Sequence, residues 1–158
     1  MDTGCPETTE EAVTLSVEEF RRLPLVASVP SIQPADGRNL VNMPLIVFTD
    51  GRPQQLATTV LGVAVIVRAT PTQFSWEFGD GTAPLVTSDP GASYPDHTVS
   101  HPYPREGTYI VQLTTTWRGE FQVAGSSVWQ PVDGTATTVS DPFTVTVEEA
   151  VPRLVSRP

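Results

Sequence analysis

The sequence predicts an all-β fold, an antiparallel β-sandwich, and three observations lead there. Apolar residues occupy every second position along residues 74–78, 109–113 and 143–147, the pattern of strands that bury one face. The chain also holds 16 prolines and 11 glycines, as expected of many short strands joined by turns. A length of 158 residues suits one domain with a good core and a tail at each end.

The strand at residues 74–78 carries the strongest signal. Phe74, Trp76 and Phe78 share one strand face, and residues 79–81 then combine two glycines with an aspartate. Glycine tolerates positive φ, and an aspartate carboxylate accepts backbone N–H groups, so the strand should end in a tight turn. Burying an indole removes ~200 Å² from water, or roughly 5 kcal/mol at ~25 cal/mol/Å² as an upper bound. We therefore expect Trp76 to anchor the core.

Two motifs then identify a family. The first reads Trp76-Glu77-Phe78-Gly79-Asp80-Gly81, and the second reads His101-Pro102-Tyr103 followed by Gly107-Thr108-Tyr109-Ile110-Val111-Gln112-Leu113. Together they resemble the PKD domain, an immunoglobulin-like β-sandwich, at that family's spacing, with Glu77 for the usual Asp. The resemblance covers roughly residues 54–149. It departs from the family in a long insertion between the motifs and another after Trp117.

The resemblance implies an immunoglobulin-like antiparallel β-sandwich of PKD type, here with a short N-terminal helix and an added hairpin. It also implies that the strand starting at Tyr109 lies beside the strand of Trp76. Structural roles follow for the motif residues, which are Trp76, Phe78, Gly79, Asp80, Gly81, His101, Tyr103, Gly107 and Tyr109.

Composition and the extent of the PKD resemblance together divide the chain into four parts. Residues 1–11 form a disordered acidic tail, 12–53 an extension with a short helix and an edge strand, 54–149 the PKD-like domain, and 150–158 a tail. The helix begins at the capping box Ser16-Val17-Glu18-Glu19 and stops at Pro24. It is too short to stand alone, so its side with Val17, Phe20 and Leu23 should dock on an apolar surface.

The remaining elements follow from turn residues and strand patterns. Residues 24–39 indicate an extended linker, and Pro44 confines the strand at 41–49 to an edge or a bulge. Strands follow at 56–61 and 63–70, and a long surface loop at 83–100. Hairpins are expected at Arg118-Gly119 and Asp133-Gly134, because each pair sits between strand-like runs.

Charge and cysteine content exclude several classes of function. The net charge is −9 and all nine basic residues are arginine, so nucleic acid and anionic membranes are poor partners. Cys5 is the only cysteine, which rules out an internal disulfide or a thiolate cluster and leaves a free thiol or a bond to another chain. The chain shows neither a membrane span nor a signal peptide, so either export information lies outside it or the protein is cytosolic.

Three arrangements of polar residues are candidate chemical sites, and none is favoured. Glu77 and Asp80 suggest a glycosidase pair, but strand parity points Glu77 away from the core. His97 and His101 lie about 13 Å apart in an extended strand, too far to share one metal ion. Calcium could draw Asp80, Asp89 and Asp96 together, although no loop has EF-hand spacing.

Aromatic residues outside the motif strand are candidates for sugar stacking, because the C–H face of a pyranose ring is apolar. The candidates are Trp117, Trp129 and Tyr94. The favoured alternative is that Trp117 and Trp129 pack on each other across the inserted hairpin and enlarge the core.

The function expected from these features is that of a non-catalytic extracytoplasmic module at the cell surface, without a cofactor. It would be structural or mediate protein–protein interaction, as the resemblance implies for PKD domains, and Thr-rich strands favour strand addition by a partner. The alternative is a carbohydrate-binding accessory domain of a secreted hydrolase, which would show a planar row of exposed Trp and Tyr. The partner is therefore a protein or a carbohydrate.

Overall fold

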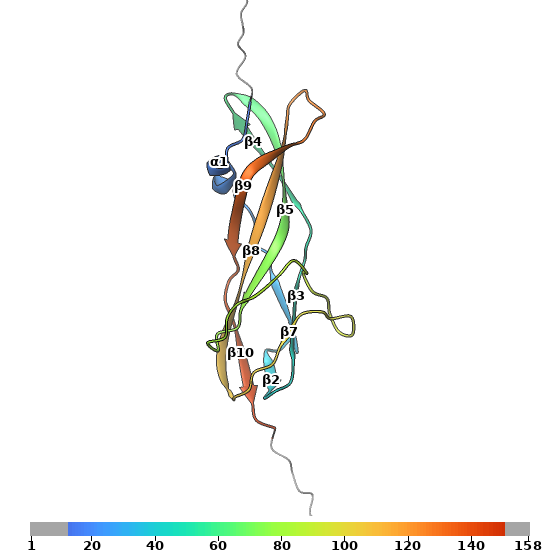
Figure 1. Cartoon of the computed structure of the whole chain (residues 1–158), viewed down its shortest axis with the longest axis vertical. Helices are drawn as coiled ribbons and strands as arrows, with labels where there is room; N and C mark the ends of the chain where they lie inside the picture. The colour runs from blue at the N-terminus through green and yellow to red at the C-terminus, as the bar shows by residue number, and fades with distance from the viewer. Residues whose placement is uncertain (1–12, 151–158) are drawn as a thin grey trace, which may run out of the picture.

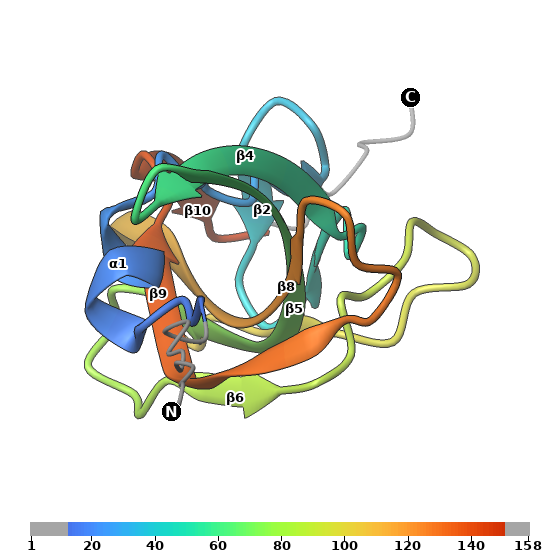
Figure 2. The same cartoon turned by 90° about the horizontal axis from the view of Figure 1, so that it is seen from above.

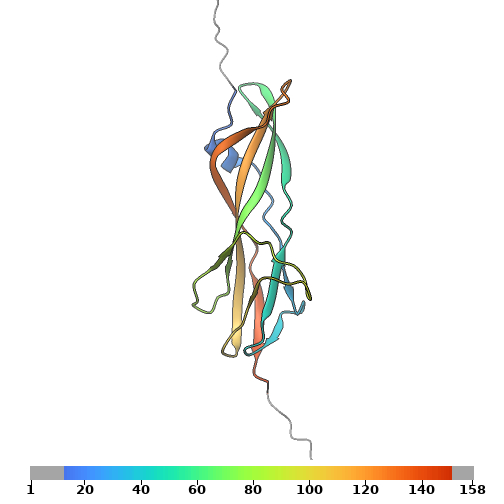
Figure 3. The same ribbon diagram turned by 45° about the vertical axis from the view of Figure 1, so that its right-hand side comes forward.

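The computed structural model describes residues 13–150 and shows an elongated, mostly β molecule (Figures 1 and 3). Its elements are α1 (Val17–Arg22), β1 (Pro30–Gln33), β2 (Arg38–Leu40), β3 (Leu45–Thr49), β4 (Gln54–Val60), β5 (Val63–Glu77), β6 (Leu85–Thr87), β7 (Ser100–His101), β8 (Gly107–Val123), β9 (Gln130–Val139) and β10 (Phe143–Glu148). The all-β sandwich with one short N-terminal helix is confirmed. Between residues 13 and 150, no helix is long and apolar enough to cross a membrane.

Two long strands form the axis of the molecule. β5 and β8 pair antiparallel from Val65 opposite Val123 to Glu77 opposite Gln112. With 15 and 17 residues they span about 50 Å at ~3.3 Å per residue. Each is flanked on its other side by two shorter strands placed one after the other, β4 and β6 beside β5, and β9 and β10 beside β8. One seven-stranded sheet thus runs the length of the molecule.

A sandwich forms at one end, where the small sheet β1-β3-β7 packs on the large one. Trp76 is fully buried between them, as predicted, and pairs with Leu113 of β8. Its indole N–H has no hydrogen-bond partner within residues 13–150, so packing alone holds the ring. The rest of this core is Leu45, Val47, Phe74, Phe78, Val99, Tyr103, Val111, Leu113, Val145 and Val147.

A second core fills the other end and includes the predicted helix. The capping box is present, with the Ser16 hydroxyl accepting from the Glu19 N–H and the Glu19 carboxylate accepting from the Ser16 N–H. Phe20 is fully buried, while Val17 and Leu23 are partly buried against the same cluster, which confirms the predicted docking. Seen from above, β4, β5, β8 and β9 curl into an open ring with α1 beside β9 (Figure 2).

The predicted hairpins at Arg118-Gly119 and Asp133-Gly134 are wrong. Both pairs lie inside strands, in β8 and β9, and the turn between these strands falls at residues 124–129. The glycines instead make room for α1. A Cβ on Gly119 would lie 2.7 Å from the Phe20 ring, and one on Gly134 would lie 2.7 Å from the Val17 side chain. The two glycines therefore do not form turns. They are needed because the side chains of α1 pack against the strands at these positions.

Two further expectations for the N-terminal part are overturned. Residues 24–39 are not simply a linker, because they contain β1, which pairs with β3, and β2, which pairs parallel with β10. The strand after Pro44 is not an edge strand either. β3 lies between β1 and β7, and its Leu45 and Val47 are fully buried. Pro44 stands just before the strand begins, where its missing N–H removes no ladder hydrogen bond.

Candidate functional site

The two motif segments meet in one cluster beside the sandwich core. His101, in β7, stacks on the Phe78 ring with centroids 4.0 Å apart and an interplanar angle of 3°. Its Nε2 lies 2.8 Å from Asp80 Oδ2. Asp80 Oδ1 accepts the Thr82 N–H at 3.2 Å, which closes the predicted turn after β5. The cluster therefore ties the end of β5 to β7.

The glycines of the turn are needed for their backbone shape and for close packing. Gly79 and Gly81 both adopt positive φ, of 78° and 83°. A Cβ on Gly79 would also collide with the backbone of Ile110 in β8. The turn is thus pressed against the neighbouring strand, and Asp80 is placed where His101 can reach it.

Two tyrosines of the second motif complete the cluster. The Tyr103 hydroxyl is buried and donates to the Phe78 carbonyl at 2.9 Å. Burial, with a smaller effect of the Asp80 charge, raises the pKa of Tyr103 well above its usual range, so the phenol stays protonated and remains a donor. Tyr109 stacks on Tyr103 at 4.4 Å and donates to the Arg105 carbonyl at 2.7 Å, which fixes the loop before β8.

The chemistry available to this cluster is limited by its enclosure. The side chains of His101 and Asp80 are only 14% and 6% exposed. Burial opposes ionisation of the Asp80 carboxyl, but hydrogen bonds from Thr82 and His101 outweigh it and lower its pKa below the ordinary value. Asp80 is thus an ionised acceptor with both oxygens engaged, a structural cross-link rather than a general acid. Glu77 is exposed on the opposite strand face, so the two carboxyls do not share a cleft.

The three calcium candidates have separate partners. Asp80 is engaged as described, and Asp89 accepts the Gly91 N–H at 2.8 Å. A Thr98 hydrogen bond, followed by that of Gly91, lowers the pKa of Asp89. Asp96 is exposed. In the part of the chain that the structure describes, no three His, Cys, Asp or Glu side chains lie close enough to hold a metal ion. Cys5 lies outside those residues.

The candidate sugar-stacking aromatics are dispersed. Trp117 is buried in the second core and donates its indole N–H to the Thr138 hydroxyl at 2.9 Å. Trp129 is half-buried beneath the Arg68 guanidinium, 4.2 Å above its ring, while Arg68 also pairs with Glu120. The two indoles thus have different surroundings and do not form the pair predicted across the hairpin. Tyr94 is exposed and stacks on His97 at the rim of an apolar pocket of about 500 Å³.

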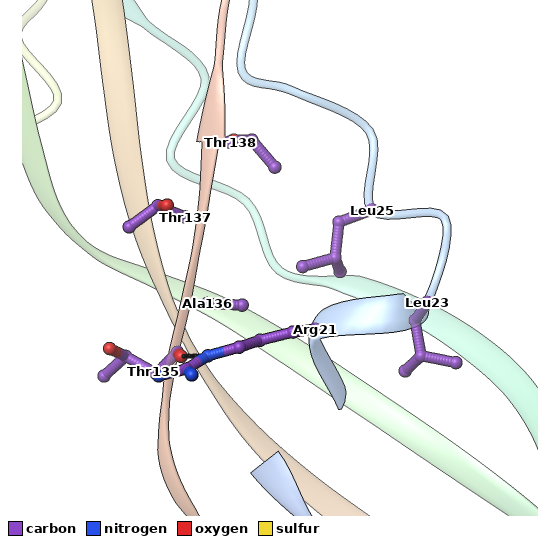
Figure 4. A pocket seen from close by; sticks show the side chains of 7 residues that line it. All are labelled: Arg21, Leu23, Leu25, Thr135, Ala136, Thr137 and Thr138. Carbon is purple, nitrogen blue, oxygen red and sulfur yellow. Dashed lines mark hydrogen bonds between the residues drawn. The ribbon is translucent and has the colours of Figure 1, made fainter. Parts of the chain in front are cut away.

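A groove between the N-terminal segment and β9 was not predicted. It has a volume of about 460 Å³ and is lined by Arg21, Leu23, Leu25, Thr135, Ala136, Thr137 and Thr138. Arg21 reaches across one end and donates from Nε to the Thr135 carbonyl at 2.9 Å (Figure 4). Arg21 and Thr135 are 114 positions apart, and the sequence pattern predicts a turn at residues 133–134, so no local pattern reveals the groove.

Comparison with known proteins agrees with this geometry. Residues 45–117 match the family model of the PKD domain, from the start of β3 into the middle of β8. A search of curated proteins finds no match to the chain. The matched range includes both motifs and begins at β3, whose side chains fill the sandwich core. Residues 45–117 of this chain are therefore similar to the PKD domain, an immunoglobulin-like module of a kind that is often extracellular and serves protein or carbohydrate interaction.

Proposed function

We propose that the chain is a non-catalytic, extracytoplasmic module that acts as a spacer and protein-interaction unit at the cell surface. The observation that supports the proposal most directly is that the two ends of the described chain lie at opposite ends of the molecule (Figure 1). The described part begins at the end of the molecule near α1 and leaves after β10 at the opposite end (Figure 1). Between these ends run β5 and β8, so a segment attached on either side would be held about 50 Å apart.

The motif cluster supports a non-catalytic role. The titratable side chains enclosed there have structural partners, Asp80 with His101 and Thr82, and Tyr103 with the Phe78 carbonyl. A reaction needs a group free to bind or attack a substrate, and the enclosed pair leaves no room for one.

The carbohydrate-binding alternative has less support. A sugar platform needs several coplanar exposed aromatics, whereas Trp117 is buried and Trp129 lies under Arg68. Tyr94 alone remains on the surface among the three candidates. Titration of tryptophan fluorescence with soluble polysaccharides tests this alternative. A saturable change would favour it over protein interaction.

The proposed location is tested on intact cells that express the full-length gene product. An antibody raised against residues 13–150 should label these cells without permeabilisation, and external protease should remove the signal. A cytosolic protein measured in parallel controls for lysis. Labelling that appears only after permeabilisation would contradict the proposal.

A further inference from the structure

Strand β9 has a free backbone edge along the groove. The Ser140 N–H donates to the Leu113 carbonyl and the Leu113 N–H to the Ser140 hydroxyl, so Leu113 faces the strand that runs beside β8. By alternation, Ala136 and Thr138 turn their backbone groups toward β8, while Thr137 turns its own outward. The outward Thr135 carbonyl bonded by Arg21 agrees with this parity. Within residues 13–150, nothing bonds the N–H or the carbonyl of Thr137.

The two sides of the groove are formed by β9 and by the segment that follows α1, and alternate side chains of an extended peptide could contact both. Ala136 and Thr138 point inward from β9, and Leu23 and Leu25 stand opposite them (Figure 4). Ala136 is buried in the second core and is the smallest side chain of this part of β9, which leaves depth above it. An apolar side chain placed over Ala136 would contact both leucines. The residues on either side of it in the segment would face solvent with Thr137.

One end of the groove carries the positive charge of Arg21. The chain as a whole has 18 acidic and 9 basic residues, yet the groove is lined by an arginine and, in the described part of the chain, by no carboxylate. Among the contacts of residues 13–150, Arg21 is engaged through Nε alone, by the Thr135 carbonyl, and the side chain is exposed. The two terminal nitrogens of the guanidinium remain available for a carboxylate.

We propose that this groove binds an extended peptide segment of a partner protein, which adds a strand to the edge of β9. The segment pairs with Thr137 through its backbone, places an apolar side chain over Ala136 and sets a carboxylate against Arg21. This names the contact surface of the module and therefore rests on the proposed function, as a case of strand addition to a sheet edge.

The probe is the hexapeptide Thr-Val-Thr-Val-Thr-Glu, with a fluorescent label on its N-terminal amine and a free C-terminal carboxylate. Its partner probe carries Lys in place of Glu and an amidated C-terminus. Binding of each to the purified full chain is followed by anisotropy. The acidic peptide should bind more tightly, by about tenfold, because a charge-assisted hydrogen bond is lost in the other. Equal binding of both peptides would contradict the role of Arg21.

Matched variants locate the site. Thr137→Pro removes the outward N–H and leaves the bonds to β8 in place, since proline is tolerated at a sheet edge. Thr137→Val keeps the N–H and serves as its control. The proline variant should bind the acidic peptide at least about tenfold more weakly, while the valine variant stays within about twofold of the wild type. Arg21→Gln should abolish the preference for the acidic peptide.

Unaltered binding by Thr137→Pro would overturn the proposal. If that variant fails to fold, the test is made on the wild-type protein. Saturating peptide should slow amide hydrogen exchange at Thr137, and an unchanged exchange rate would overturn the proposal. If the wild-type protein is a dimer and Thr137→Pro is a monomer, the groove binds a second copy of this chain instead of a partner protein, and the proposal is overturned. If the peptide does not bind but the intact cells are still labelled, the groove is not a peptide site and the proposed function is unaffected. If the peptide binds but the protein is found only in the cytosol, the peptide site is supported and the proposed surface function is contradicted.

Discussion

The substitution Gly119→Ala tests how α1 is held. The added Cβ would lie 2.7, 2.9 and 3.0 Å from three carbons of the Phe20 ring, and that ring is fully buried, so any shift of it would disturb the surrounding core. Overpacking of this kind costs about 1–3 kcal/mol. The backbone of Gly119 is not in the left-handed region, so alanine recovers about 0.4–1 kcal/mol from the unfolded chain. At the midpoints of these two ranges the cost exceeds the gain, so the free energy of unfolding should fall by about 1 kcal/mol, and by no more than about 2.6 kcal/mol.

Urea unfolding followed by tryptophan fluorescence measures this change, with an unaltered m value expected. A double-mutant cycle with Phe20→Ala is the control. Removing the ring costs about 3–5 kcal/mol alone, but in that background Gly119→Ala should stabilise by about 0.4–1 kcal/mol, because the clash has gone and the entropic gain remains. A stabilising Gly119→Ala, or strictly additive costs in the double variant, would refute the account of how the helix packs.

The other predictions concern the motif cluster. Asp80→Asn should lower the free energy of unfolding by about 1.5–3 kcal/mol at neutral pH, because charge-assisted bonds to His101 and Thr82 are lost. The folded pKa of Asp80 lies below its ordinary 3.8, so this stabilisation is present above that pH and is lost as pH falls through the folded value. Urea titrations at several pH values should show the difference from wild type shrinking below about pH 4. Tyr103→Phe should cost about 1–2 kcal/mol in urea, since it removes the buried donor to the Phe78 carbonyl. The melting temperature should not respond to millimolar calcium or a chelator, because the oxygens of Asp80 and Asp89 already accept hydrogen bonds.

The parts of the fold that could be predicted are those governed by local chemistry. Alternation of Phe74, Trp76 and Phe78 places them on one face whatever the partner strand is, and the glycines after them tolerate the positive φ that the turn requires. The helix was predictable for the same reason, because Ser16 and Glu19 cap each other within one turn. The motif cluster followed from the PKD resemblance, which supplied the spacing between its two segments.

The rest depends on contacts between residues distant in sequence. Gly119 and Gly134 look like turn residues, and only the presence of α1 against the sheet explains them as strand residues. β1 and β2 have weak patterns of their own and form because β3 and β10 offer them edges. The groove joins Arg21 to Thr135, 114 positions apart, so it emerges only when the chain is folded.

Amide hydrogen exchange along β9 tests most directly the claim that this edge is open for binding. The amides of Ala136 and Thr138 face β8 and should exchange only when the strand is released, whereas the Thr137 amide faces the groove. If release requires global unfolding of about 5 kcal/mol, Thr137 should exchange more than about 1,000-fold faster than its two neighbours. Equal protection at all three positions would show that the edge is already paired and would contradict the account.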